Sequence, residues 1–512
     1  MNYPVWQTLF PAGLLIAVVA VVHVFVSHFA IGGGAFLVLT ESTAYRRNDL
    51  GLLQYVKRHS KFFALLTLVF GAVTGVGIWF TIGLVSPEAT SSLIHTFVWG
   101  WAIEWVFFFV EITAAIIYAY NWDRLDRKTH LTIGWIYFIA AFMSLVVING
   151  IITYMLTPGA WLQTKNFWDG FFNPTYWPSL AMRSVICVLL AGVFGLITAV
   201  RERGEVRDRV VRLAGMWIVA GSVLLPLTAW WYYAKFPVFA KAYMAGALPA
   251  AQHPVRGGIT CAALGLLFAL VFAIWKPRLM RAPLVVFMMI FAFGLMASGE
   301  YLREFVRKPW VITGYIYAND LRTEAIDSHI ANGAQPKWLT VANPEEDQVG
   351  YGRELFTIQC SKCHSVDGYR GMTKRVRGWD ATFAANMLAH LDQLRGNAMP
   401  RFAGNAADRQ ALGAYLATLS PARAETITDA NRAEIGKQVF VTRCGACHTL
   451  GGTVRPLDAA FTGASPEQVR DMLPVLESMS PNMPPWTGTD AEAQALSTYI
   501  SSILSENAGA AK

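Results

Sequence analysis

Long apolar runs recur in this 512-residue chain up to about Tyr301 and then stop. A run of 18 or more apolar residues is long enough to cross the hydrocarbon core of a membrane as a helix. Backbone groups inside a bilayer must be satisfied within the protein, so such runs form helices. The run Gly32-Gly33-Gly34 interrupts the first of them and predicts a shorter first helix than its apolar length suggests. We predict eight spanning helices at residues 11–40, 61–85, 94–120, 131–156, 179–200, 211–233, 257–275 and 283–306.

Basic residues are concentrated in alternate loops between these spans. The loops after spans 1, 3, 5 and 7 carry 16 Lys and Arg, whereas those after spans 2, 4 and 6 carry 4. Cytoplasmic loops are the ones enriched in Lys and Arg, which predicts that both chain ends lie outside. The positive charge therefore indicates membrane topology and not nucleic-acid binding. We expect a multi-pass protein of the bacterial cytoplasmic (inner) membrane, with its C-terminal part on the periplasmic side.

The C-terminal part repeats itself at an offset of 84 residues. The repeated features are two C-x-x-C-H motifs, Cys360–His364 and Cys444–His448, and two Met-Pro pairs, Met399-Pro400 and Met483-Pro484. A repeat this regular indicates a duplicated domain. The predicted divisions are a membrane bundle at 1–320, a polar linker at 321–347, and two small all-α domains at 348–425 and 430–507.

The C-x-x-C-H motif contains the groups that attach haem covalently. Its two thiols form thioethers to the haem vinyl groups, and the adjacent His supplies an axial nitrogen to the iron. A Met about 35 residues later can supply sulfur from the other face. Met372, Met387 and Met479 are alternative ligands, and a zinc or thioredoxin-like site is an alternative interpretation that the following His disfavours. We predict two haem c groups of the class I cytochrome c type, held by Cys360, Cys363, His364 and Met399, and by Cys444, Cys447, His448 and Met483.

Ionisable side chains at membrane depth are costly and mark functional sites. Two histidines in the first span are five positions apart and lie on different faces, so each is either functional or a hydrogen-bonded core residue. Two glutamates in the third span share one face, which is typical of a proton path or a haem-facing site, with a structural pair as the alternative. A Glu–Arg pair ends the eighth span and can pair at i,i+3, with an interfacial charge cluster as the alternative. These residues are His23, His28, Glu104, Glu111, Glu304 and Arg307.

The membrane part resembles subunit I of the cytochrome bd oxidase superfamily. The resemblance extends over about 300 residues and does not depend on a single motif. The segments that carry it are Gly71–Gly83, Ala102–Glu111, Trp122–Leu125, Asn149-Gly150 and Glu304–Trp310.

The resemblance implies roles for the ionisable residues. His23 would be the proximal ligand of a high-spin haem at the oxygen site, with His28 as the alternative because the alignment shifts by one residue at the triple glycine. Glu304 would ligate a second high-spin haem b, and Arg307 would lie near its propionates or its carboxylate ligand. Glu104 and Glu111 would serve proton delivery and the distal pocket. The expected membrane cofactors are two high-spin haems, one haem b and the other haem b or haem d.

Three departures from the family pattern concern the low-spin haem b and the quinol site. The fifth-helix segment Leu180–Ser184 lacks the family's histidine ligand, and Arg256-Gly257-Gly258 stands where the seventh-helix Met ligand is expected. The outer loop that binds quinol in the family is shortened to about twenty residues. We therefore expect the low-spin haem to be absent or differently ligated, and electrons to enter through the haem c domains.

Together these patterns predict an oxidoreductase that is a cytochrome c-linked branch of the superfamily and not a standard quinol oxidase. Its expected reaction is the reduction of oxygen to water, with cytochrome c or another periplasmic protein as electron donor. A second bd-type membrane subunit, the lipid bilayer and no nucleic acid are its expected partners. A nitric oxide or peroxide reductase is an alternative, because the haem supplies the chemistry in each case. A non-catalytic electron-transfer subunit between membrane and periplasm is another, and the missing low-spin ligands disfavour it.

Overall fold

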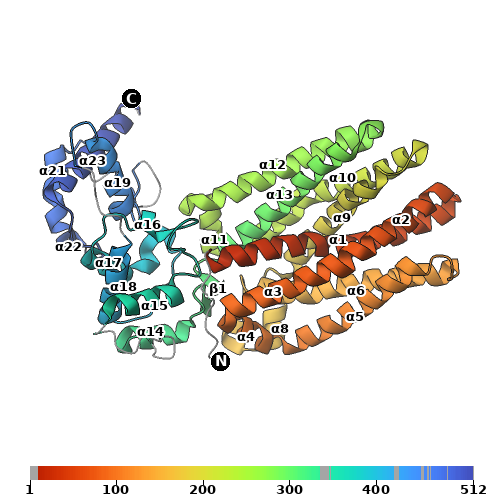
Figure 1. Ribbon diagram of the computed structural model, residues 1–512, viewed down its shortest axis with the longest axis horizontal. Helices are drawn as coiled ribbons and strands as arrows, with labels where there is room; N and C mark the ends of the chain where they lie inside the picture. The colour runs from red at the N-terminus through yellow and green to blue at the C-terminus, as the bar shows by residue number, and fades with distance from the viewer. Residues whose placement is uncertain are drawn as a thin grey trace.

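The computed structural model describes residues 10–334, 339, 345, 347–419, 426–450, 455–457, 461, 463–480 and 482–510. Over these residues the chain forms a bundle of long helices, followed at one end by two small helical domains (Figure 1). Eight helices of the described part are long and apolar enough to cross a membrane. The predicted all-α fold class, with eight spans and two small domains, is confirmed.

All but one of the eight spanning helices are longer than the apolar runs that predicted them, because polar turns extend several of them beyond the apolar core; the exception is α5, which begins at Val98 and not at residue 94. Short helices link the spans: α4 (Pro87–Thr96), α7 (Trp161–Thr164), α8 (Phe167–Phe171), α11 (Val238–Ala242), η2 (Tyr243–Ala247) and η5 (Pro277–Leu279). The spans are α1 (Ala12–Arg47), α2 (Leu50–Leu65) continuing through η1 (Leu66–Gly71) into α3 (Ala72–Val85), α5 (Val98–Tyr120), α6 (Arg127–Tyr154), α9 (Tyr176–Ala199), α10 (Gly204–Ala234), η3 (Pro249–Ala251) continuing through α12 (Gln252–Phe268) into η4 (Ala269–Trp275), and α13 (Ala282–Val306).

The triple glycine does not break the first span, since α1 runs through it to Arg47. A Cβ atom on Gly32 would lie 1.9 Å from the Cys187 carbonyl oxygen of α9. On Gly33 it would lie 2.7 Å from the ring of Phe63 in α2, and on Gly34 2.5 Å from the ring of Tyr137 in α6. Small residues allow membrane helices to approach closely. The run is therefore the point at which three neighbouring helices pack against α1.

A short ribbon and a helix connect the bundle to the C-terminal domains. The antiparallel strands β1 (Trp310–Ile312) and β2 (Ile316–Tyr317) follow α13 directly. Helix α14 (Thr323–Asn332) lies within the segment predicted as a linker. The linker residues 335–338, 340–344 and 346 lie outside the described residues.

The two C-terminal domains share a helix crossing. The built Cβ of Gly352 would lie 2.1 Å from the Ala411 carbonyl oxygen, and that of Gly436 2.1 Å from the Ala495 carbonyl oxygen. In each domain the first and last helices therefore touch. The contact positions of the second domain follow those of the first at the repeat offset of 84 residues. The elements are α15 (Gln348–Gln359), α16 (Met372–Arg375), α17 (Ala381–Ala389), η7 (Leu391–Gly396) and α18 (Ala406–Thr418), then α19 (Arg432–Val439), η8 (Phe440–Cys444), α21 (Pro466–Met472), η9 (Leu473–Val475), α22 (Leu476–Met479) and α23 (Asp490–Ala510).

Candidate haem sites

Both C-x-x-C-H motifs form tight turns that follow the first helix of their domain. In the first domain the His364 backbone N–H donates to the Cys360 carbonyl at 2.9 Å. The second domain repeats the bond between His448 and Cys444 at 2.9 Å. All six cysteines of the chain are free thiols. The two thiols and the imidazole of each motif therefore lie together on one turn, as covalent haem attachment requires.

The histidine of each motif has the orientation of an iron ligand. The Nδ1 atom of His364 lies 3.2 Å from the Arg370 carbonyl oxygen, and that of His448 lies 3.1 Å from the Arg455 carbonyl oxygen. A carbonyl accepts only from Nδ1–H, so the lone pair is on Nε2 and free to bind iron. Burial, reinforced by the nearby Arg375, lowers the pKa of His364 to about 4, so its ring is neutral near pH 7. These residues fit haem c.

The predicted sulfur ligands lie in different surroundings. Met399 packs in a small apolar cluster with Phe383, Met387 and Cys447, at the contact between the two domains. Met483 is partly buried, whereas the alternative Met479 is half exposed. The repeated methionines thus remain the candidates for the second axial position.

The first cytochrome-like domain rests against one end of the membrane bundle through its haem-attachment motif. Lys362, between the two cysteines, pairs with Asp320 at 3.1 Å, and both side chains are buried. Its carbonyl accepts from the Gly13 N–H at the start of α1, at 3.3 Å. Nearby, the hydroxyls of Tyr369 and Tyr301 are 2.7 Å apart. The motif is therefore held against the ends of α1 and α13.

Glu304 lies at the C-terminal end of α13, beside this junction. It pairs with Arg307 at 2.5 Å and with Lys308 at 2.8 Å. Arg307 is buried, and its Nη1 also lies 3.6 Å from the Met155 sulfur. Gly13 of α1 lies between the first C-x-x-C-H motif and the Glu304 carboxylate, because a Cβ there would lie 3.8 Å from the Lys362 carbonyl oxygen and 3.9 Å from Glu304 Oε1.

The two histidines of α1 differ in which ring nitrogen is free. The Thr74 hydroxyl lies 2.8 Å from the Phe70 carbonyl and can donate to it, so it can accept from Nδ1 of His23, 3.1 Å away. This arrangement leaves the Nε2 lone pair of His23 available to a metal. In His28, Nδ1 donates to the Val24 carbonyl at 2.8 Å. Its Nε2 faces the guanidinium of Arg183 at 3.5 Å and is therefore engaged.

Glu104 and Glu111 both face α6 from α5. Glu104 accepts from the Ser144 hydroxyl at 3.0 Å, and Glu111 accepts from the Tyr137 hydroxyl at 3.1 Å. The same Tyr137 hydroxyl lies 3.0 Å from the Ala30 carbonyl of α1. The two carboxylates therefore share one helix face, as their spacing predicts, and Tyr137 connects that face to α1.

Comparison with known proteins assigns both parts of the chain. Residues 12–246 match the family model described as cytochrome bd terminal oxidase subunit I, and residues 347–416 and 431–500 match that described as cytochrome C oxidase, cbb3-type, subunit III. The chain carries a cytochrome bd subunit I domain followed by two cytochrome c domains. A bd oxidase from Geobacillus thermodenitrificans has a similar fold, with a TM-score of 0.53 and 17% identity over 59% of this chain and 88% of that chain. No curated protein matches the chain.

These families establish the general character of the protein. It is a haem-containing, bd-type oxidase-like protein of the membrane, and its families are those of oxidoreductases and electron carriers. The cytochrome c domains imply covalent haem c, and the bd subunit I domain implies b-type haems. Oxidases of the bd type work with a second subunit, and cbb3-type cytochrome c domains accept electrons from partners.

A buried charge cluster joins α9 and α13 in the bd subunit I domain. Arg183 on α9 is buried, and its Nη2 lies 4.0 Å from Glu300 of α13, which also pairs with Arg303 at 2.8 Å. On α12, a Cβ on Gly257 would lie 3.2 Å from the Ser298 hydroxyl. A guanidinium thus lies in the α9 segment, and a close helix contact at the α12 position, for which the sequence predicts no low-spin haem ligand. The sequence signal was a charged residue inside an apolar span, but its partners became visible only in the fold.

Proposed function

We propose that this protein is a cytochrome c-linked oxygen reductase, in which electrons pass through two haem c groups to high-spin haems in the membrane domain. The observation that carries the proposal is the junction between the first cytochrome c domain and α13. The Cys360–His364 motif lies beside the helix end that carries Glu304, and Gly13 of α1 approaches both, since a Cβ there would lie 3.8 Å from the Lys362 carbonyl oxygen and 3.9 Å from Glu304 Oε1. An electron carrier docked directly at that helix end can replace the low-spin haem as the electron entry.

The contact between the two cytochrome c domains supports an order for electron transfer. Met399 of the first domain and Cys447 of the second pack against the same apolar cluster. The Trp379 indole donates to the Thr442 carbonyl at 2.9 Å, and Arg443 donates to the Gly378 carbonyl at 2.5 Å. The iron-ligand side of the first domain thus meets the haem-attachment side of the second. We infer that the second domain receives electrons from cytochrome c or another periplasmic donor and passes them to the first.

In the membrane domain, we propose His23 and Glu304 as ligands of the two high-spin haems. A haem iron with one protein ligand keeps a coordination position open for a small molecule such as oxygen. Thr74 orients the His23 ring with Nε2 free, whereas Nε2 of His28 is engaged by Arg183. Arg307 and Lys308 stabilise the Glu304 carboxylate and provide positive charge for haem propionates. These contacts favour His23 over His28.

We propose that Glu104 and Glu111 hold the protons consumed in oxygen reduction. Both carboxylates lie at membrane depth and are hydrogen-bonded from α6, so each can exchange a proton with a hydroxyl partner. Tyr137 contacts Glu111 and the backbone of α1, seven residues from His23. A proton on Glu111 therefore has a hydrogen-bonded neighbour on α6, and the hydroxyl of that neighbour also reaches the backbone of the helix that carries the proposed haem ligand.

The assembled enzyme is proposed to contain a second bd-type membrane subunit, as the family does. The excess of Lys and Arg in the loops at the opposite end of the bundle supports a periplasmic location for the cytochrome c domains. There they would meet a periplasmic electron donor.

Oxygen uptake by the purified holo-complex tests the proposal. We expect uptake with reduced soluble cytochrome c and not with a quinol. Uptake driven by quinol alone would refute the proposed electron entry. No oxygen uptake with either donor, with the haems intact, would favour nitric oxide or peroxide as the acceptor, or an electron-transfer role without catalysis.

A further inference from the structure

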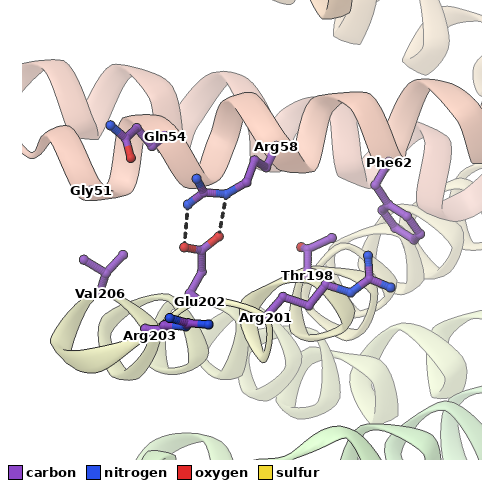
Figure 2. Close-up of a pocket in the computed structure, with 9 residues that line it drawn as sticks. All are labelled: Gly51, Gln54, Arg58, Phe62, Thr198, Arg201, Glu202, Arg203 and Val206. Carbon is purple, nitrogen blue, oxygen red and sulfur yellow. Dashed lines mark hydrogen bonds and ion pairs between the residues drawn. The ribbon is translucent and has the colours of Figure 1, made fainter.

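A pocket of about 480 Å³ opens at the end of the bundle opposite the cytochrome c domains. It lies between α2 and the turn that connects α9 to α10 (Figure 2). Gly51 closes one end, since a Cβ there would lie 2.6 Å from the Val206 side chain of α10. Pockets of this volume are typical of small-molecule sites. None of the residues assigned to haem or proton chemistry lines it.

Three arginines surround this pocket and only one of them is paired. Arg58 and Glu202 form a two-point ion pair across it, with N–O distances of 2.9 and 2.5 Å (Figure 2). Within the part of the chain that the structure describes, the guanidinium groups of Arg201 and Arg203 have no ion-pair or hydrogen-bond partner. The pocket therefore carries two uncompensated positive charges, which favours an anionic ligand with several acceptor oxygens, such as a phosphate.

The position of the pocket indicates the source of that phosphate. Thr198 belongs to the last turn of α9, and Arg201 to Arg203 occupy the turn just beyond it, at the end of two spanning helices. The Arg201 guanidinium points toward Phe62, which lies further along α2 toward the apolar part of the bundle (Figure 2). Basic pockets between spanning helices at the cytoplasmic surface bind anionic lipid head groups. A lipid phosphate could contact the arginines while its acyl chains pass over Phe62.

We propose that this pocket binds the phosphate group of an anionic phospholipid of the cytoplasmic leaflet through Arg201 and Arg203. Soluble inorganic phosphate has the same charge chemistry without acyl chains, so the two sources can be separated. The proposal is independent of the oxidase reaction, because it concerns the opposite end of the bundle.

Lipid titration of the detergent-solubilised holo-complex, with binding followed by native mass spectrometry, tests the site. The probes are phosphatidylglycerol, zwitterionic phosphatidylethanolamine and inorganic phosphate. We expect preferential retention of phosphatidylglycerol, weakened roughly fivefold for each arginine removed in Arg201→Gln/Arg203→Gln. The matched control is Arg47→Gln/Arg281→Gln, which removes two exposed charges from the same end of the bundle, outside the pocket. The control should retain the lipid as the unmodified protein does.

A variant that should tighten lipid binding, in place of weakening it, provides a second test. Glu202→Gln removes the carboxylate that neutralises Arg58, so phosphatidylglycerol should bind more tightly. An equal loss of lipid in the pocket and control variants would overturn the proposal, because it would mean diffuse surface attraction. Inorganic phosphate that displaces phosphatidylglycerol at matched concentration would overturn the lipid assignment in favour of a soluble ligand.

Discussion

The ion pair between Lys362 and Asp320 tests how the first cytochrome c domain is held on the membrane domain. The two side chains are only 5% and 8% exposed, and Nζ lies 3.1 Å from Oδ2. Asp320 also accepts from the Ser86 hydroxyl at 2.9 Å and from the backbone N–H groups of Glu88 and Ala89 at 2.8 Å. The two partners are therefore not equivalent. The carboxylate keeps three donors when the lysine is removed, whereas the lysine loses its countercharge when the carboxylate is neutralised.

Because the two partners are not equivalent, the two substitutions should cost different amounts of docking free energy. Leaving one member of a buried ion pair charged and unpaired costs about 3–5 kcal/mol. Asp320→Asn should show this cost in the equilibrium between docked and open domains, a shift of roughly two to four orders of magnitude. Lys362→Met should cost less, about 1.5 kcal/mol, the lower value for losing one interaction with a charged group, because Asp320 keeps its three donors. The exposed pair between Asp327 and Arg401, at 2.8 Å, provides a control, because exposed pairs contribute about 0–1 kcal/mol.

Amide hydrogen exchange of the purified holo-complex measures the opening. We expect Asp320→Asn to accelerate exchange in the first turn of α4 and around the Cys360–His364 motif. The acceleration should be at most as large as the shift in the equilibrium between docked and open domains. Lys362→Met should accelerate exchange around the motif by about tenfold and leave α4 protected. Asp327→Asn should leave both segments unchanged. Equal acceleration by the first two variants, or none by either, would refute the inference that this pair holds the domain on the bundle.

Three further perturbations address the haem sites and the helix packing. His23→Ala should abolish one high-spin haem spectrum while His28→Ala retains it, because only His23 has a free Nε2; an intact spectrum in His23→Ala would transfer the assignment to His28. Met483→Ala should lower the reduction potential of the second haem c in a redox titration, because a Met ligand raises it, and an unchanged potential would exclude Met483 as ligand. Gly32→Ala should destabilise the bundle by about 1–3 kcal/mol in thermal unfolding, because its Cβ would lie 1.9 Å from a backbone oxygen. Gly83→Ala, with nothing within 4 Å, is the control, and equal effects of the two would contradict the packing argument.

The departures from the family pattern have a common structural basis. Arg183, in the α9 segment where the sequence lacks the expected histidine, is held by Glu300, and Gly257, at the expected Met position on α12, makes a close contact with α13. In the same chain a haem-attachment motif lies at the end of α13, beside Glu304. Under the proposed function, loss of the internal electron relay and gain of an external one are two parts of the same change.

Local patterns in the sequence were sufficient for the architecture and the covalent chemistry. Membrane spans depend on apolar length, orientation depends on loop charge, and haem attachment depends on residues within one turn. The 84-residue repeat likewise predicted matched domains, which the equivalent contacts of Gly352 and Gly436 now bear out. Each of these features is determined by residues close in sequence or by an exact internal copy.

Only the tertiary structure decided which distant groups meet. The triple glycine was interpreted as an interruption, because glycine weakens an isolated helix, but contacts with three other helices make it a packing point. The sequence could not distinguish His23 from His28, since the difference lies in a hydroxyl on α3 and a guanidinium on α9. The pairing of Lys362 with Asp320 joins separate domains. A hydrogen bond or ion pair depends on distances of a few ångströms between elements far apart in the chain, and no local pattern specifies those distances.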